Sequence, residues 1–585
     1  MSYILGINAY HADSSACLLH QGQLIAAAEE ERFNRLKHWS GFPTRAIQFC
    51  LQEAGLSLHE IDYIAQNRRP WSNMAKKFWF ILTNRPDKKL VGKRLAHAGH
   101  WLNIKKQLLQ ALGIDSLRAQ ICFVEHHHAH LASSFFVSPM ERAAILSVDG
   151  FGDFSSVAWG IGTGSRLQIM ARVFFPHSLG LLYLALTQYL GFCSYGDEYK
   201  VMGLAAYGQP SFIKEMEHLI HLLPRGQFRL DLRYFCHHSQ NFTYEWHNTI
   251  PQIGKVYTDN LIKLLGPPRS CEEPVVERHQ DIACSLQLIY ERALYHILNY
   301  LHDQTQIDSL CLAGGCAMNS VANGKISNHT PFKNLYIQPA PGDAGGAIGA
   351  AFVAWHEIKK RPRNFIMEHA LWGPSYNKNA IISAIEARTF ELTKEGCIWE
   401  LILEEEHLLK LTAEAIAEGK VVGFFQGRME WGPRALGNRS ILADPRRSNM
   451  KDILNLKIKR RESFRPFAPS ILREAVSEYF EKDDDVPFML QVFKVIPEKR
   501  SAIPAVTHID GSGRLQTVSA NNNLRYYRLI KKFRDITGIP IVLNTSFNEN
   551  EPLVNLPEEA LDCFIRTQMD ILVLEDYFIS RQEHR

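Results

Sequence analysis

Two histidines spaced four residues apart are the clearest candidates for chemistry in this sequence. His126 and His130 lie in a run rich in Ala, Leu and Ser, which predicts a helix with both imidazoles on one face. The apolar residues 143–148 then predict a buried strand that ends at Asp149. Two imidazoles and one carboxylate form a ligand set for a metal ion. The alternative is a histidine pair that is solvated or hydrogen-bonded to its neighbours.

Asp343 is a fourth candidate ligand. It lies at the mouth of a turn, residues 339–344, between a predicted strand and a helix of small residues that can pack tightly.

The sequence also contains a weak internal repeat. Residues 4–19 and 145–160 share a strand, a polar turn with an acid, Ser-Ser and another strand. This repeat predicts two similar halves, as in actin, heat-shock chaperones and sugar kinases.

A double glycine marks a candidate nucleotide site. Gly314 and Gly315 follow a predicted buried strand, residues 309–313, and precede a helix start that includes Asn319. Such a turn lets the backbone approach a nucleotide, and a helix N-terminus favours anionic groups. A plain tight turn is the alternative.

Basic residues beside Gly and Pro turns gather in the last third of the chain. Guanidinium forks on rigid turns suit a phosphate or another oxyanion, because each fork can bind two oxygens. A structural salt-bridge network is the alternative. A predicted strand, residues 541–548, adds amide and hydroxyl donors. The candidates are Arg434, Arg439, Lys459, Arg465, Arg514, Asn544 and Ser546.

Residues 66–107 differ in composition from the rest of the chain. They contain eleven Lys and Arg against one acid, Asp87. This composition fits an RNA-binding surface or an inserted helical subdomain whose basic side chains extend over apolar stripes. The helical spacing of the aromatic residues favours the second interpretation. These aromatic residues are Trp71, Phe78, Trp79, Phe80 and Trp101.

Size and composition limit the class of protein. A chain of 585 residues predicts two or three domains, and a net charge of +4 does not by itself indicate nucleic acid. No apolar run is long enough to span a membrane, and no signal segment is present at the start. The eleven cysteines form no CxxC pair. We therefore expect a cytoplasmic protein with reduced thiols and neither a nucleic acid nor a membrane partner.

Several long motifs, in order, resemble the O-carbamoyltransferase family that includes the nodulation-factor, cephamycin and tobramycin carbamoyltransferases. They include HADSSA, EEERF, HHHAH, PGDAGGAIGA, GPRALGNRSILADPR, FRPFAP and NTSFN. The motifs cover nearly the whole chain, except for a variable helical insert at about residues 66–120. One departure is visible. The family often has His-Asp-Ala-Ser after the first strand, whereas this chain has Ala12 and Asp13 in swapped order.

The resemblance implies a two-domain α/β enzyme. Residues 1–356 would form an actin-like duplicated domain, like that of the tRNA threonylcarbamoyl transferases, and residues 371–585 a YrdC-like domain. The second domain would make carbamoyl adenylate from carbamoyl phosphate and Mg-ATP. The first would transfer the carbamoyl group to a hydroxyl of a small-molecule acceptor, such as a secondary metabolite. A homodimer is compatible with this scheme.

The resemblance also implies roles for individual residues. His11 would be the general base, with Lys37 nearby, and a histidine suits this role because its ordinary pKa is about 6.5. A divalent metal, for which the resemblance favours iron, would be held by His126, His130, Asp149 and Asp343. Carbamoyl phosphate and the adenylate would be held by Arg434, Arg439, Lys459, Arg465, Arg514, Asn544 and Ser546.

The sequence leaves three other classes of function to compare with this one. A tRNA-modifying transferase of the threonylcarbamoyl type is the main alternative, because the fold is shared and the insert is basic. A hydrogenase-maturation carbamoyl transferase is disfavoured, since its relatives carry an acylphosphatase domain and CxxC zinc motifs. A non-catalytic sugar- or nucleotide-binding protein is the remaining class.

Overall fold

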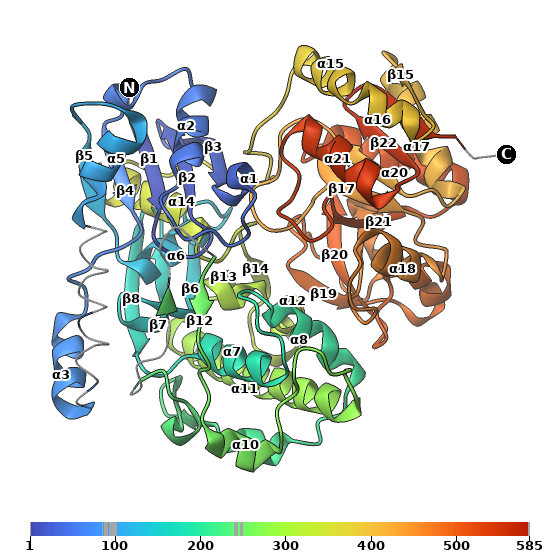
Figure 1. The fold of residues 1–585 in the computed structure, drawn as a ribbon. Helices are drawn as coiled ribbons and strands as arrows, with labels where there is room; N and C mark the ends of the chain where they lie inside the picture. Colours follow the sequence, from blue (N-terminus) through green and yellow to red (C-terminus); the bar gives the residue numbers. More distant parts are fainter. Residues whose placement is uncertain are drawn as a thin grey trace. The chain divides into compact units, whose positions relative to one another are not determined.

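The structure is a computed structural model that describes residues 2–84, 86, 92, 102–238, 244–245 and 250–582. Trp101 of the insert therefore lies outside the described residues. The chain forms two compact units, Met1–Met367 (unit 1) and Glu368–Arg585 (unit 2). Both units are mixed α/β structures (Figure 1).

Unit 1 contains two five-stranded sheets with the same strand order. The first is β3 (Gln23–Glu29), β2 (Ser15–His20), β1 (Tyr3–Asn8), β4 (Tyr63–Gln66) and β5 (Gln120–Phe123). The second is β8 (Arg166–Phe174), β7 (Ser155–Thr163), β6 (Arg142–Gly152), β13 (Ser309–Ala313) and β14 (Asn334–Tyr336). In both, three antiparallel strands continue into two parallel ones. The predicted repeat is confirmed, and unit 1 is an actin-like duplicated fold.

Two helices form a layer between these sheets. Helix α14 (Gly345–Val353) packs on β1 and β2, and α6 (His126–Phe135) packs on β6 and β13. The two helices also pack on each other, and every residue of α14 is buried. A Cβ atom added at Gly349 would lie 1.8 Å from the carbonyl oxygen of Ala129. The small residues of α14 therefore allow the close approach that the sequence predicts.

Further helices cover the outer faces of the sheets. The first sheet is covered by α2 (Thr44–Glu53), and the second by α7 (Leu179–Tyr189) and the long α11 (Glu277–Thr305). Smaller helices of unit 1 are α1 (Glu31–Asn34), α8 (Glu198–Leu204), α9 (Ile213–Glu217), α10 (Asp259–Leu265), α12 (Ser320–Gly324) and α13 (Ile326–His329). Among the described helices, none combines the length and the apolar character that crossing a membrane requires.

The insert contributes two described helices, α3 (Met74–Asn84) and α5 (Ile104–Leu112). The prediction of helical structure for the aromatic residues is confirmed where α3 is described. Unexpectedly, only Phe80 among the residues of α3 is buried. The prediction that these aromatic residues form covered apolar stripes is therefore wrong for α3.

Unit 2 is built on one mixed sheet of nine strands. Its order is β15 (Cys397–Leu401), β23 (Tyr577–Arg581), β22 (Ile571–Leu574), β16 (Val422–Phe425), β17 (Arg439–Ala443), β21 (Ile541–Ser546), β18 (Ala468–Leu472), β20 (Ser512–Val518) and β19 (Gln491–Lys494). The helices of this unit are α15 (Lys378–Ala387), α16 (Thr389–Lys394), α17 (Glu405–Ala417), α18 (Met450–Ile453), α19 (Val476–Tyr479), α20 (Leu524–Thr537) and α21 (Pro557–Thr567).

Candidate metal centre and anion site

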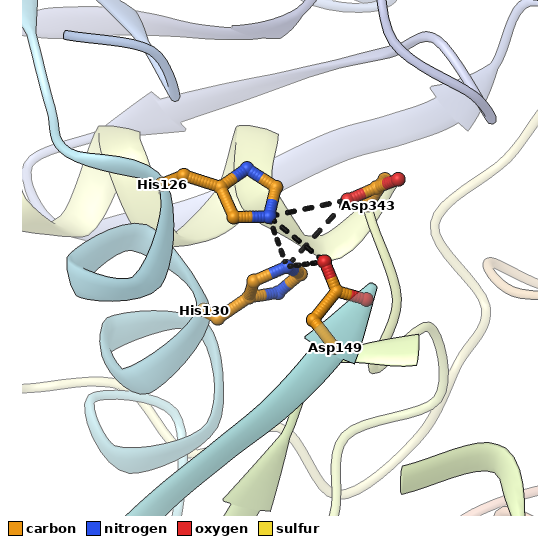
Figure 2. A group of neighbouring side chains, drawn as sticks. All are labelled: His126, His130, Asp149 and Asp343. Atoms are coloured by element: carbon orange, nitrogen blue, oxygen red, sulfur yellow. Dashed lines mark hydrogen bonds and ion pairs between the residues drawn. The ribbon is translucent and has the colours of Figure 1, made fainter. Parts of the chain in front are cut away.

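Helix α6 is fixed at its N-terminus before it presents its histidines. The Glu125 side chain caps the helix by accepting from the His128 N–H at 2.9 Å. The His126 N–H donates to Asp153 Oδ2 at 3.0 Å. With the first turn held on two carboxylates, His126 and His130 project from one helical face toward Asp149 and Asp343 (Figure 2).

The four predicted ligands come together in the structure. His126 Nε2 lies 3.0 Å from His130 Nε2 and 3.0 Å from Asp149 Oδ2. Asp343 Oδ1 lies 3.5 Å from both Nε2 atoms, and His130 Nε2 lies 3.6 Å from Asp149 Oδ2. Ligands held about 2.1 Å from one ion would lie roughly 3–3.5 Å apart. The spacing therefore fits coordination of one ion.

Each carboxylate has one oxygen held from behind and one directed at the histidines. Asp149 Oδ1 accepts from the Gly315 N–H at 2.9 Å, and Asp343 Oδ2 contacts His11 Nδ1. Gly314 has a φ of +89°, and a Cβ there would lie 2.2 Å from the Val148 carbonyl oxygen. The double glycine thus lets the Gly315 amide approach and orient a candidate ligand.

Burial and mutual contact shift the pKa values of these groups. Burial, and then the charge of His130, lowers the pKa of His126 to about 3. Burial alone would lower the pKa of His130 as well, but its hydrogen bonds to Asp149 and Asp343 raise it to about 9. The pKa of Asp149 is held well below its ordinary value, because hydrogen bonds from both histidines outweigh the cost of burial. The pocket is thus built around two carboxylates that need positive charge.

The donor set fits a divalent transition metal. All four residues are buried, and imidazole nitrogen with carboxylate oxygen suits Fe, Zn and similar ions. The buried Asp343 Oδ1 has only long contacts among the described residues, at 3.5 Å to the Nε2 atoms of His126 and His130. A buried carboxylate oxygen without a close donor is costly, and a bound cation would satisfy it.

His11 lies beside this pocket. Besides its Asp343 contact, its ring centre is 5.3 Å from that of His126.

A second group of side chains forms around His38. His38 Nδ1 pairs with Asp13 Oδ1 at 2.8 Å, and the His38 N–H donates to Glu31 Oε2 at 2.7 Å. Burial alone would lower the pKa of His38, but the two carboxylates raise it to about 9.

This second group of side chains contains Lys37 and Asp13. Burial alone would raise the pKa of Glu31, but the charges of Arg32, His38 and Lys37 contribute to lowering it, and Lys37 belongs to the group through this charge. Asp13, whose role the swapped motif puts in doubt, is the residue that pairs with His38. Glu31 was missed by the sequence analysis, although it lies in the quoted EEERF motif.

The Asn319 side chain makes hydrogen bonds to two helices, α12 and α11. Its Oδ1 accepts from the Ala322 N–H at 3.1 Å and caps α12, and its Nδ2 donates to Gln287 Oε1 at 3.0 Å. Gly314, Gly315 and Asn319 therefore lie in one connected segment that links Asp149 to α11.

In unit 2, a buried glutamate shapes the loop that carries Arg434. Glu430 Oε1 accepts from the backbone N–H groups of Leu436, Asn438 and Arg439 at 2.7–3.1 Å. Asn544 Nδ2 donates to the Ala435 carbonyl oxygen at 3.1 Å and ties the loop to β21. Asn544 is fully buried, so its predicted contact with a ligand remains a prediction.

Four arginines lie close enough to repel one another. Burial, and then the positive charges of Arg434, Arg461 and Arg465, holds the pKa of Arg514 well below its ordinary value. All four side chains are only partly exposed. An acid, Glu462, lies 3.3 Å from Arg465. Accumulated guanidinium charge in a partly buried place favours an anion. Arg461 was not among the predicted site residues, because three adjacent basic residues, 459–461, gave no sign of which one points inward.

Arg439 and Lys459 make different contacts from the four arginines of this cluster. Arg439 is fully buried, and its NH1 and NH2 groups donate to the carbonyl oxygens of Gln426, Asn438, Pro374 and Gly427. Its Cζ atom also lies 3.6 Å from the Phe425 ring centre. These contacts do not match the predicted anion fork, since both terminal nitrogens are bonded to the backbone. The Lys459 side chain is buried, and its Nζ donates to Ser546 O, Ser546 Oγ and Asn548 O.

Unit 1 has an actin-like duplicated fold, and each unit holds one of the two candidate sites. Residues 3–352 match the family model described as Carbamoyltransferase N-terminus, and residues 413–581 match Carbamoyltransferase C-terminus. The chain belongs to the carbamoyltransferase family and is a carbamoyltransferase.

Relatives match over most of the chain. Uncharacterized protein sll1178 of Synechocystis is 40% identical and covers 99% of this chain and 97% of its own length. Nodulation protein NolNO of Sinorhizobium fredii is 38% identical and covers 98% of this chain and 80% of its own length. Among solved structures, HypF of T. kodakarensis is 15% identical with a TM-score of 0.30, covering 61% of this chain and 48% of its own. That structural likeness is too weak to support a functional argument.

Proposed function

We propose that the protein is an ATP-dependent O-carbamoyltransferase that acts through carbamoyl adenylate. Unit 2 would hydrolyse carbamoyl phosphate to carbamate and phosphate and join the carbamate oxygen to the α-phosphorus of ATP, releasing pyrophosphate. Unit 1 would transfer the carbamoyl group to an acceptor hydroxyl and release AMP. The resemblance to the O-carbamoyltransferase family supports a small-molecule hydroxyl as acceptor. In this scheme unit 2 is a YrdC-like domain.

The arginine cluster supplies the first half of this chemistry. Carbamoyl phosphate and ATP are both polyanions, so their encounter needs positive charge held in place. Arg434, Arg465 and Arg514 would contact their oxygens, with Arg461 as a fourth cation. Arg439 would act as a positioning residue, because its donors hold the turns from which Arg434 extends. Lys459, Ser546 and Asn544 would complete the site along β21.

The histidine side of unit 1 supplies the second half. His126, His130, Asp149 and Asp343 would hold a divalent metal, with iron favoured by the family resemblance, and that ion would offset charge on the AMP phosphate. Asp343 contacts His11 Nδ1, which sets the tautomer whose Nε2 carries the lone pair. His11 Nε2 would then remove the acceptor proton, as in other Asp–His pairs. Lys37 would help to hold the acceptor, and Gly314, Gly315 and Asn319 the nucleotide.

The observation that carries this proposal is the convergence of four buried ligands in a chain whose other unit gathers four arginines. The test is incubation of the purified protein with ATP, carbamoyl phosphate and a panel of hydroxyl compounds. We expect a product heavier by one carbamoyl group, formed only when both co-substrates are present, with AMP and pyrophosphate in equal amounts. Formation of ADP instead of AMP would contradict the adenylate step.

The alternative of a tRNA-modifying enzyme has a distinct outcome in the same assay. Incorporation of carbamoyl carbon into co-purified tRNA, with loss of that incorporation on ribonuclease treatment, would replace the small-molecule proposal.

A further inference from the structure

Cys193 and Cys271 are the two exposed cysteines of the chain, and their sulfurs lie in contact. The Sγ atoms are 3.2 Å apart, although the residues are 78 positions apart in the sequence. The other cysteines are buried or half-buried. Cys193 lies in the loop between α7 and α8, and Cys271 lies in the loop between α10 and α11. Two exposed thiols in contact can exchange with a small disulfide, whereas buried thiols are inert.

Backbone contacts bring the two loops together. The Arg269 N–H donates to the Tyr189 carbonyl oxygen at 3.1 Å, and Arg269 Nε donates to the Leu190 carbonyl oxygen at 2.6 Å. Gly191 has a φ of +75°, and a Cβ atom there would lie 2.7 Å from the Arg269 carbonyl oxygen. The glycine therefore permits this close approach. The fold itself sets the two cysteines side by side.

The residues next to the two cysteines are also held. The Ser194 N–H donates to Asp197 Oδ2 at 3.2 Å, and the Ser270 N–H donates to Glu273 Oε2 at 2.8 Å. Because both loops are already ordered, joining the sulfurs costs the folded chain little conformational entropy.

A metal site is the other common use of paired thiols. Structural zinc takes four ligands. Among the described residues, no group of three or more His, Cys, Asp or Glu side chains placed to share one ion includes either cysteine. Burial, and then the hydrogen bond to Cys271, raises the pKa of Cys193 to about 11. Cys193 is therefore a thiol at neutral pH, and the first attack on an oxidant falls to Cys271.

We propose that Cys193 and Cys271 are a redox modification site that forms a reversible disulfide by exchange with a low-molecular-weight disulfide. The Cys271 sulfur attacks one sulfur of the reagent, forms a mixed disulfide and releases one small thiolate. The Cys193 sulfur then attacks the Cys271 sulfur and releases the second small thiolate. The two released thiolates take up the two protons that the cysteines lose. Both protein thiols are thus oxidised, and one reagent disulfide is reduced to two thiols.

The bridge restricts a loop that packs on His38. The Tyr195 ring centre lies 5.3 Å from that of His38, and a Cβ atom added at Gly196 would lie 2.5 Å from His38 Nε2. His38 follows Lys37, to which the proposed function gives the acceptor. A bridge at Cys193 ties this loop to the start of α11 and limits its opening. Only the link to the acceptor rests on the proposed function.

The test is incubation of the reduced full chain with oxidised glutathione, followed by alkylation and peptide mass mapping. We expect one cross-linked pair of peptides, joined through Cys193 and Cys271, whose mass is lower by two hydrogen atoms until dithiothreitol restores it. The bridge should be favoured at least about tenfold in the folded chain over the urea-unfolded chain, because the fold brings the sulfurs together. After oxidation, the amides of residues 191–197 should exchange their hydrogens more slowly.

Two variants sharpen the test. Cys193→Ser lacks the second thiol, so the reaction should stop with one glutathionyl group on Cys271. The matched control is Cys284→Ser, which changes a half-buried cysteine of α11 and should still form the bridge. These readouts need no acceptor, so failure of the proposed carbamoyl transfer would leave them unchanged.

Several results would overturn the proposal. Thiols that stay fully alkylated, or glutathione on both cysteines without a cross-link, would show that the sulfurs do not join. Equal bridging in the folded and unfolded chains would show that the fold does not favour the bond. Unchanged hydrogen exchange of residues 191–197 in the bridged chain would remove the effect on the loop at His38.

Discussion

The metal centre of unit 1 and the arginine cluster of unit 2 have opposite charge imbalances. In the first, two buried carboxylates face two imidazoles, and His130 has its pKa raised to about 9 because the carboxylates demand a positive charge. In the second, three arginines push the pKa of a fourth, Arg514, downward. A cation would balance the charge of the first site, and an anion would balance that of the second. This contrast indicates the charge of each site's expected ligand better than either motif does alone.

The largest effect is expected at the metal centre. Asp149→Ala removes a carboxylate that touches both histidines, so metal affinity should fall by more than about 100-fold, since even changes behind the ligands cost 10–100-fold. Metal content per chain, measured by mass spectrometry after dialysis, checks this. Asp308→Ala, at an exposed ion pair with Lys333, is the control and should retain the metal. Full metal content in Asp149→Ala would show that the cluster is not the binding site.

The next largest effect is expected at the arginine cluster of unit 2. Arg514→Ala should weaken carbamoyl phosphate binding by about 100-fold, because a partly buried fork is lost from the site. It should not lower the melting temperature, since like-charge repulsion is relieved. Titration calorimetry measures the first quantity, with the exposed Arg528→Ala as control. A large loss of stability without weaker binding would make Arg514 a structural residue.

Substitution of Arg439 tests whether this arginine supports the fold and does not belong to the anion-binding cluster. Arg439→Met leaves buried carbonyl oxygens without donors, so unit 2 should lose about 3 kcal/mol of unfolding free energy. Denaturant unfolding followed by a probe in unit 2 measures this change. Arg528→Ala should change stability by less than about 0.5 kcal/mol. If both variants are equally stable, the carbonyl contacts do not support the fold.

The smallest effect is a pH dependence at His38. Its folded-state pKa of about 9 exceeds the ordinary value of about 6.5, because Asp13 and Glu31 outweigh the effect of burial. The stabilisation is therefore complete below about pH 6.5 and is lost as the pH rises through 9. His38→Gln should flatten the fall in melting temperature between these pH values. An unchanged slope in the variant would mean that His38 is not charged in the folded protein.

The sequence predicted that the four candidate metal ligands come together, because the geometry that groups them is local. The spacing of His126 and His130, the strand end at Asp149 and the turn at Asp343 each follow from a few neighbouring residues. The repeat predicted two similar halves. The matching strand order of the two sheets confirms that prediction.

The sequence could not assign partners to individual basic residues. Arg439 and Arg434 lie in one motif, yet the carbonyl oxygens that bind Arg439 come from Pro374 and from residues 426–438. Such a contact depends on how distant turns meet. The orientation of α3 was hidden for a related reason. Helical spacing of aromatics shows that a helix forms, but it does not show which side touches the protein.

Pyrophosphate–ATP isotope exchange, with and without carbamoyl phosphate, tests most directly whether the two sites perform separate half-reactions. We predict exchange that requires carbamoyl phosphate, persists in Asp149→Ala and disappears in Arg514→Ala. Exchange that survives in Arg514→Ala, or that is lost in both variants, would contradict the division of chemistry between the two units.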